Sequence, residues 1–155
     1  MVYEIAEIDW GSTLSMRLSD YAGSCSFQGT GAFFAGLIRE NGFEDYEKAF
    51  AVISEGKIIG FGAILNECLC LEDDKSPWLD FLFVDEEYRS LGIGSDLIER
   101  ICDYARVHDF ESIYLCTVTH AEYYMRSGFN TLYSTCFFNN TLNDIPIYIM
   151  KRELK

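Results

Sequence analysis

Residues 89–94, RSLGIG, contain two glycines two positions apart and an arginine three positions before the first of them. They lie between an apolar segment that ends at Val84 and a segment whose apolar residues have helical spacing. The first amides of a helix have no partner within the helix and lie at the positive end of its dipole. Glycines let these amides approach a ligand closely, and Arg89 adds a charge that persists near neutral pH. The combination predicts an anion-binding site.

Two common phosphate-binding motifs are absent from this loop. The dinucleotide motif G-x-G-x-x-G needs a third glycine at position 97, where Leu97 stands, and no G-K-[S/T] follows as in a P-loop. A two-glycine turn can also be a plain helix start, so that alternative stays open on spacing alone.

The segment LFVDEEYRSLGIGSDLI (82–98) resembles the acetyl-CoA motif [R/Q]-x-x-G-x-[G/A] of the GNAT acetyltransferases and matches it at Arg89, Gly92 and Gly94. The resemblance implies that the loop amides hold the pyrophosphate of coenzyme A and that the preceding strand contacts its pantetheine arm. It also implies acetyl-CoA as co-substrate. The coenzyme-binding residues that it implies are Leu82, Phe83, Val84, Arg89, Ser90, Leu91, Gly92, Ile93, Gly94 and Ser95.

A second stretch, AEYYMRSGF (121–129), resembles the fourth helix of the same family, in which a tyrosine lies four residues before a glycine. That tyrosine is Tyr124 here, and the resemblance implies that it protonates the departing coenzyme A thiolate. A phenol with a pKa of about 10 can donate to an alkyl thiolate of similar basicity. Tyr123 is expected to point elsewhere, and simple packing of both rings remains the alternative. Thr117 stands where many members have asparagine, which leaves coenzyme contacts from that side open.

A carboxylate is the candidate general base, because neither histidine is well placed in these motifs. Asp80 lies inside the apolar segment PWLDFLFV (77–84), where burial would raise its pKa and suit it to proton transfer. Glu67 is the second choice and a candidate for substrate binding. The alternative for Asp80 is that it faces solvent or binds a cationic substrate.

The acceptor site is expected to involve the first two helices and their loop, as the resemblance implies. Tyr21 and Phe27 are the candidate substrate-binding rings, and Asp20 lies nearby in sequence. Aromatic faces and carboxylates together can hold a cationic amine. Most rings of this region can equally well belong to the core.

The length, composition and net charge of the whole chain limit the fold and the partners that are possible. Its 155 residues, 49% hydrophobic, predict a single domain over residues 1–155. A net charge of −13 argues against nucleic acid and anionic membrane as partners and favours a cationic acceptor, although acidity can also serve only solubility. Without an apolar run of membrane length or a signal peptide, we expect a cytoplasmic protein with reduced cysteines. Cys68 and Cys70 have no nearby histidine, so no metal site is expected.

Hydrophobic spacing predicts strands at 2–8, 48–54, 58–71, 77–84 and 112–118, and a closing hairpin of 131–138 and 145–153 around a turn at 139–144. It predicts helices at 12–22, 32–41, 95–108 and 120–129, with a glycine-containing loop at 23–31. This order gives an α/β fold with a mixed sheet. The resemblance implies the GNAT fold, with about seven strands flanked by four helices.

The expected function is N-acetylation of a primary amine of a small cationic acceptor. Two alternatives remain on the same fold: a non-catalytic acyl-CoA sensor or interaction module, and an acetyltransferase for protein lysines or N-termini. Exposed strand edges of such a fold can pair between copies, so a homodimer is compatible with the sequence.

Overall fold

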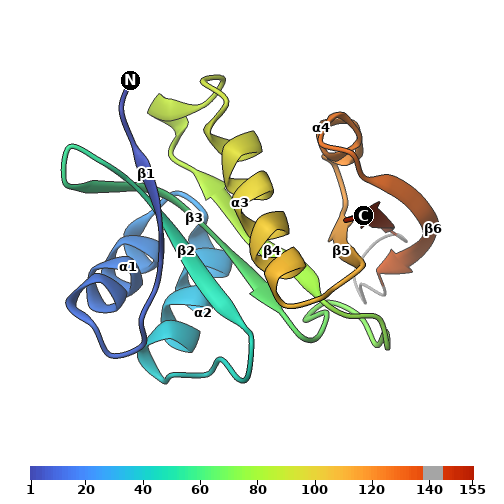
Figure 1. Cartoon of the computed structure of the whole chain (residues 1–155), viewed down its shortest axis with the longest axis horizontal. Helices are drawn as coiled ribbons and strands as arrows, with labels where there is room; N and C mark the ends of the chain where they lie inside the picture. Colours follow the sequence, from blue (N-terminus) through green and yellow to red (C-terminus); the bar gives the residue numbers. More distant parts are fainter. Residues whose placement is uncertain (138–144) are drawn as a thin grey trace.

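The computed structural model describes residues 1–137 and 145–155, which form a seven-stranded sheet with helices on both faces (Figure 1). The predicted turn at 139–144 lies outside the described residues. The strands are β1 (Glu4–Glu7), β2 (Lys48–Ser54), β3 (Lys57–Leu65), β4 (Trp78–Val84), β5 (Ser112–Thr117), β6 (Asn130–Phe137) and β7 (Ile145–Glu153). The described helices are α1 (Thr13–Ser24), α2 (Gln28–Arg39), α3 (Ile93–Val107) and α4 (Ala121–Arg126), with a short 3-10 helix at Glu86–Tyr88.

The sheet has the order β1-β2-β3-β4-β5-β7-β6, and only the β4–β5 pair is parallel. Alternate residues of β2 belong to different hydrophobic cores, one on each face of the sheet, because successive side chains of a strand point to opposite faces. Phe50 and Val52 belong to the core beneath α3, whereas Ala49 and Ala51 belong to the core beneath α1 and α2. The mixed sheet, the four helices and the predicted order of elements are confirmed.

The start of the second helix was predicted wrongly. Residues 28–31 lie in α2, not in a loop, so the connection between α1 and α2 is much shorter than expected. Gly31, one of the glycines that suggested a turn, has a packing role instead. A Cβ on Gly31 would overlap the carbonyl oxygen of Ala22, so glycine at this position lets the two helices approach closely.

Several strands and helices are shorter than predicted. β3 ends at Leu65, and the apolar residues that follow belong to a loop at 66–76. α4 spans only Ala121–Arg126. The helical spacing of apolar residues that predicts a helix at 95–108 reflects one buried side of α3, whose members are all fully buried: Leu97, Ile98, Ile101, Cys102 and Ala105.

β4 and β5 are paired at one end only. Trp78 pairs with Tyr114, and the Tyr114 amide donates to the carbonyl of Pro77 at 3.0 Å. Beyond this point no further pair joins the two strands, and Figure 1 shows them diverging toward their carboxyl ends. The sheet is therefore open between β4 and β5, close to the loop that the sequence singled out.

β4 also contains a bulge. Phe61 of β3 pairs with Phe83 and Ala63 pairs with Asp80, so two residues of β4 lie opposite Gly62. Phe81, one of these two, has a positive φ of 54°. A bulge bends its strand and leaves backbone groups unpaired in the ladder. It therefore makes backbone groups of β4 available beside the opening.

Within the described part of the chain, no helix has both the length and the hydropathy that crossing a membrane requires. All six cysteines are free thiols.

Candidate active site

A cavity of about 740 Å³ lies at the carboxyl end of β4, between the first turn of α3 and helix α4. Its lining comes from three parts of the chain that are distant in sequence, within residues 26–27, 82–95 and 120–126. The lining residues are Ser26, Phe27, Leu82, Phe83, Val84, Tyr88, Arg89, Ser90, Gly92, Ile93, Gly94, Ser95, His120, Tyr123, Tyr124 and Arg126. Nine of the ten predicted coenzyme-binding residues are among them. Leu91 is the exception, because its side chain is 57% exposed on the outside of the loop.

The first turn of α3 forms one wall. Gly92 precedes the helix in the left-handed conformation, with a φ of 84°, and its carbonyl accepts the first helical hydrogen bond from Asp96 at 3.0 Å. The amides of Ile93, Gly94 and Ser95 have no acceptor within the helix, and all three residues line the cavity. This wall therefore offers hydrogen-bond donors at the positive end of a 15-residue helix.

Arg89 is held at the end of β4. Its Nε donates to the carbonyl of Val84 at 2.8 Å, and its guanidinium lies 5.7 Å from the ring centre of Phe83. Among the described residues, its two terminal nitrogens have no hydrogen-bond partner. They remain available to an anion in the cavity.

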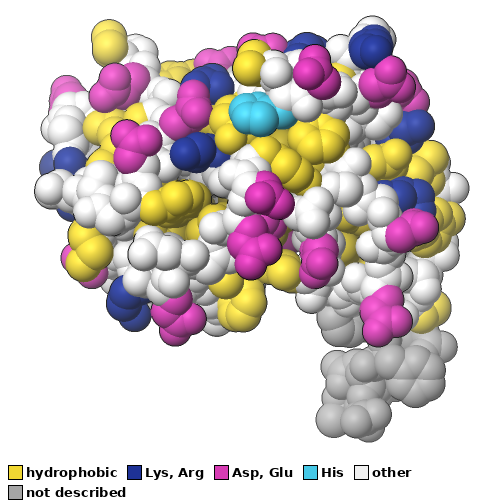
Figure 2. Space-filling model, turned by 60° about the horizontal axis from the view of Figure 1, so that its bottom comes forward, with side chains coloured by type: hydrophobic (Ala, Val, Ile, Leu, Met, Phe, Trp, Pro, Cys, Tyr) yellow, Lys and Arg dark blue, Asp and Glu magenta, His cyan; other side chains and the backbone are white. Residues whose placement is uncertain are grey.

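The charge of the lining differs from that of the chain. The sequence has 25 acidic and 12 basic residues, and acidic side chains are spread over the face seen in Figure 2. Within the described residues, the cavity lining contains Arg89, Arg126 and His120 but no aspartate or glutamate. The sequence reasoning missed His120 and Arg126, although both lie within one helical turn of Tyr124. The site thus concentrates positive charge in a strongly acidic protein.

Tyr124, the predicted proton donor, lines the cavity. Burial raises the pKa of its phenol, and the nearby Tyr123, Asp80 and Cys116 raise it further. The hydroxyl therefore remains protonated throughout the neutral range and can act as a proton donor.

Tyr123 does not point away from the site, contrary to the prediction. It lines the same cavity, with its hydroxyl directly above Gly94. Its ring packs edge-on against Tyr124, with 5.2 Å between ring centres. Nothing in the spacing of the motif indicates this contact, because it depends on how α4 packs against α3.

Asp80 lies behind the cavity, outside its lining. Its Oδ1 accepts a hydrogen bond from the Phe81 amide at 2.7 Å. Burial raises the pKa of this carboxyl to about 6, and the charge of Cys68 also raises it, whereas the hydrogen bond acts in the opposite direction. Asp80 is close enough to Tyr124 to raise the pKa of that phenol. The two candidate catalytic groups therefore interact electrostatically.

The three predicted acceptor residues do not lie together. Phe27 lines the cavity and stacks on Phe83 at 5.3 Å. Tyr21 lies next to it, packs edge-on against Phe61 at 6.0 Å and donates a hydrogen bond to Asp85 at 3.3 Å. Glu67 is exposed in the 66–76 loop, which lines a separate hollow of about 1000 Å³. Phe27 thus lines the cavity and Tyr21 packs on Phe83 beside it, whereas Glu67 lies elsewhere.

No group of three or more histidine, cysteine, aspartate or glutamate side chains within the described ranges has an arrangement that fits a metal ion.

A family model described as "Acetyltransferase (GNAT) family" matches residues 4–129. No curated protein matches the chain by sequence. Many solved structures resemble it. An aminoglycoside 6'-acetyltransferase type Ii superposes with a TM-score of 0.77 at 19% identity, covering 98% of this chain and 97% of the other.

Two further structures contain the coenzyme. An aminoglycoside 6'-N-acetyltransferase complexed with coenzyme A has a TM-score of 0.74 at 17% identity, covering 98% of this chain and 97% of the other. A GNAT acetyltransferase from Elizabethkingia anophelis with bound acetyl-CoA has a TM-score of 0.64 at 13% identity, covering 97% of each chain. At these identities the likeness concerns the fold.

Proposed function

Because the chain belongs to the acetyltransferase (GNAT) family, we propose that it transfers the acetyl group of acetyl-CoA to a primary amine of a small cationic acceptor. The reaction type and the co-substrate follow from the family. The acceptor class and the residue roles given below are inferred from the site.

The observation that carries the proposal is the composition of the 740 Å³ cavity. Three unpaired amides at the start of α3 and two arginines face it, and no acidic side chain lines it. A chain with a net charge of −13 repels the phosphates of coenzyme A at long range. Attraction must therefore come from local groups, and the cavity is where these groups are concentrated. We place the pyrophosphate at the amides of residues 93–95, with Arg89 beside it.

The rest of the coenzyme follows the opening in the sheet. The pantetheine arm extends along Leu82, Phe83 and Val84, beside the bulge of β4, and brings the thioester close to Tyr124. The amine attacks the carbonyl carbon, and the bond from that carbon to sulfur then breaks. Tyr124 protonates the departing thiolate. Positioning of amine and thioester together, with backbone donors polarising the carbonyl, supplies most of the rate acceleration.

The acceptor amine must lose a proton before it attacks. Asp80 has a carboxyl pKa of about 6, so it is ionised at neutral pH and more basic than an ordinary carboxylate. We assign it the role of general base, acting through water because it lies outside the cavity lining. Asp80 lies close enough to Tyr124 for its charge to raise the pKa of that phenol, which supports a shared role of the two groups in one reaction.

The acceptor is proposed to be small and cationic for two reasons. The acidic surface attracts cations, and Phe27 and Tyr21 place aromatic rings beside the coenzyme cavity. The aminoglycoside acetyltransferases among the similar structures are named for polycationic acceptors, which agrees with this class.

Calorimetric titration with acetyl-CoA tests the coenzyme site. We expect micromolar binding by the wild type and its loss in Arg89→Glu. Arg17→Glu is the matched control, because it changes the net charge equally on α1, outside the cavity. Loss of binding in both variants would show an effect of overall charge and would contradict the assignment. If only Arg89→Glu loses binding, a panel of amines assayed for released thiol then tests the acceptor class.

A further inference from the structure

Three cysteines lie together beside β5, although they are distant in sequence. Cys68 and Cys70 belong to the 66–76 loop, and Cys116 lies in β5. The sulfurs of Cys68 and Cys116 are 3.9 Å apart. Cys70 is exposed and lies close enough to both to affect the pKa of their thiols. None of the three lines the coenzyme cavity, so this cluster is separate from the proposed active site.

The surroundings hold Cys68 and Cys116 in contact. Both pack against a small core formed by Trp78, Ile147 and Ile149. The sulfur–sulfur bond of a disulfide is about 2 Å long, so closing the observed gap requires changes of side-chain rotamer and a small shift of the loop.

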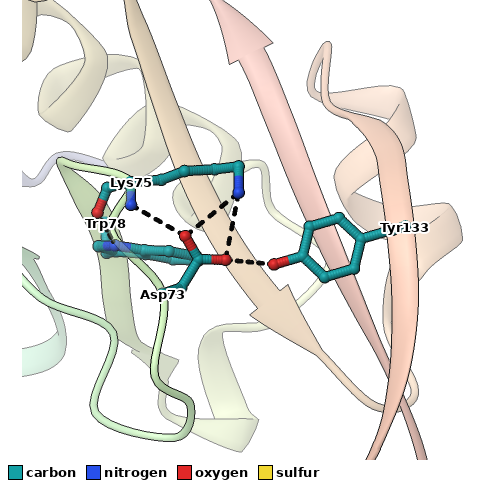
Figure 3. A network of polar contacts seen from close by, with 4 residues as sticks. All are labelled: Asp73, Lys75, Trp78 and Tyr133. Atoms are coloured by element: carbon teal, nitrogen blue, oxygen red, sulfur yellow. Dashed lines mark hydrogen bonds and ion pairs between the residues drawn. The ribbon is translucent and has the colours of Figure 1, made fainter.

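The far part of the same loop is already fastened to β6. Figure 3 shows Asp73 accepting hydrogen bonds from Lys75 and from the Tyr133 hydroxyl. The Asp73 side chain is only 4% exposed, and the Lys75 ammonium also lies 5.1 Å from the centre of the Tyr133 ring. The indole nitrogen of Trp78 donates to the Lys75 carbonyl at 2.6 Å. These contacts hold the loop against the sheet, so Cys68 stays beside Cys116.

The three thiols are not equivalent in reactivity. Contacts with Cys116 and Cys70 lower the pKa of Cys68, whereas contacts with Cys68 and Cys70, together with burial, raise the pKa of Cys116. The thiolate is the nucleophilic form of cysteine. Cys68 lines the hollow of the 66–76 loop and Cys116 does not, so a dissolved disulfide reaches Cys68 first and Cys68 is the attacking group. By contrast, Cys102 is fully buried in α3, and burial raises the pKa of its thiol.

We propose that Cys68 and Cys116 form a redox-active thiol pair that closes to a disulfide by exchange with a low-molecular-weight disulfide. The Cys68 thiolate attacks one sulfur of the disulfide, forms a mixed disulfide and releases one thiolate. Cys116 then loses its proton and attacks the Cys68 sulfur, which forms the protein disulfide and releases the second thiolate. Two protein thiols are oxidised and one small disulfide is reduced to two thiols. The bridge joins the 66–76 loop covalently to β5.

The reduced full-length protein, treated with oxidised glutathione and mapped by mass spectrometry, provides the test. We expect a Cys68–Cys116 disulfide with the loss of two hydrogens, while Cys102 stays a free thiol. In Cys116→Ser the second step is blocked, so glutathione should accumulate as a stable mixed disulfide on Cys68. Cys68→Ser should form neither product at these positions.

Adducts confined to the exposed Cys70 and Cys136, or a disulfide between Cys68 and Cys70, would overturn the proposal. Hydrogen exchange of the 66–76 loop tests the consequence of the bridge. Exchange in this loop should slow on oxidation of the wild type and stay the same in Cys68→Ser. An unchanged rate in the oxidised wild type would show that the bridge does not fasten the loop.

Discussion

The hydroxyl of Tyr123 occupies the space that any side chain at position 94 would need. A Cβ on Gly94 would overlap the Tyr123 hydroxyl oxygen. The same Cβ would lie 3.5 Å from Cζ, the ring carbon that carries the hydroxyl, and this distance is an ordinary van der Waals contact. The family motif accepts glycine or alanine at this position. In this chain an alanine at position 94 requires the Tyr123 side chain or the first turn of α3 to move, because the Tyr123 hydroxyl reaches this turn.

Gly94→Ala should therefore destabilise the protein by about 1–3 kcal/mol, the usual range for overpacking. It should also weaken acetyl-CoA binding, since the first turn of α3 must shift. In a Tyr123→Phe background the same substitution should have little effect, because the overlapping oxygen is gone. Urea unfolding and calorimetry of the four proteins in this double-mutant cycle measure the coupling. Equal effects of Gly94→Ala in both backgrounds would disprove the contact.

Two glycines of α2 should respond in opposite ways to the same substitution. Gly31→Ala places a methyl group against the Ala22 carbonyl and 3.1 Å from the Cys25 sulfur, so the loss of stability should be about 1–3 kcal/mol. Gly36→Ala adds a methyl group in open space within the same helix and should stabilise by about 0.5–1 kcal/mol. Urea unfolding of both variants gives the comparison. Similar changes in both would contradict the close packing of α1 on α2.

The close contacts of Gly94 and Gly31 show where sequence reasoning succeeds and where it fails. The order of elements and the buried stripe of α3 depend on local periodicity, which the sequence displays directly. Whether Gly31 ends a helix or lets two helices approach is not a local property, so the sequence pattern alone predicts a loop at this position. The same holds for Tyr123, Arg126 and the contact of Cys68 with Cys116, which depend on how separate elements pack.

Tyr124→Phe should reduce kcat by about 100-fold or more, within the range usual for loss of a general acid. The dissociation constant for acetyl-CoA should change by less than about twofold, because a hydroxyl that acts only on the departing thiolate adds little to ground-state binding. Stopped assays of thiol release and calorimetry measure the two quantities. Tyr148→Phe, which removes a hydroxyl from a half-buried ring of β7 outside the cavity lining, is the control. Unchanged kcat in Tyr124→Phe would remove this residue from the mechanism.

Asp80→Asn should change the pH dependence of both activity and stability. The carboxyl has a pKa of about 6 in the folded protein and an ordinary value of 3.8. For catalysis, kcat/KM of the wild type should rise with pH through about 6, as the base ionises. The variant should have a low kcat/KM that does not rise with pH through this range. Asp74→Asn, in an exposed part of the 66–76 loop, should keep the wild-type profile.

The same raised pKa makes ionisation of Asp80 unfavourable to folding. Between about pH 4 and 6 the folded state binds the proton that the unfolded state has released, so the contribution of this group to stability falls as pH rises. The loss is complete above pH 6 and amounts to up to about 3 kcal/mol, because one pKa unit corresponds to about 1.4 kcal/mol. Asparagine keeps an oxygen for the Phe81 amide and cannot ionise. The variant should therefore gain stability relative to the wild type as pH rises from 4 to 7, measured by urea unfolding. A constant difference across this range would show that Asp80 is not buried as an ionisable group.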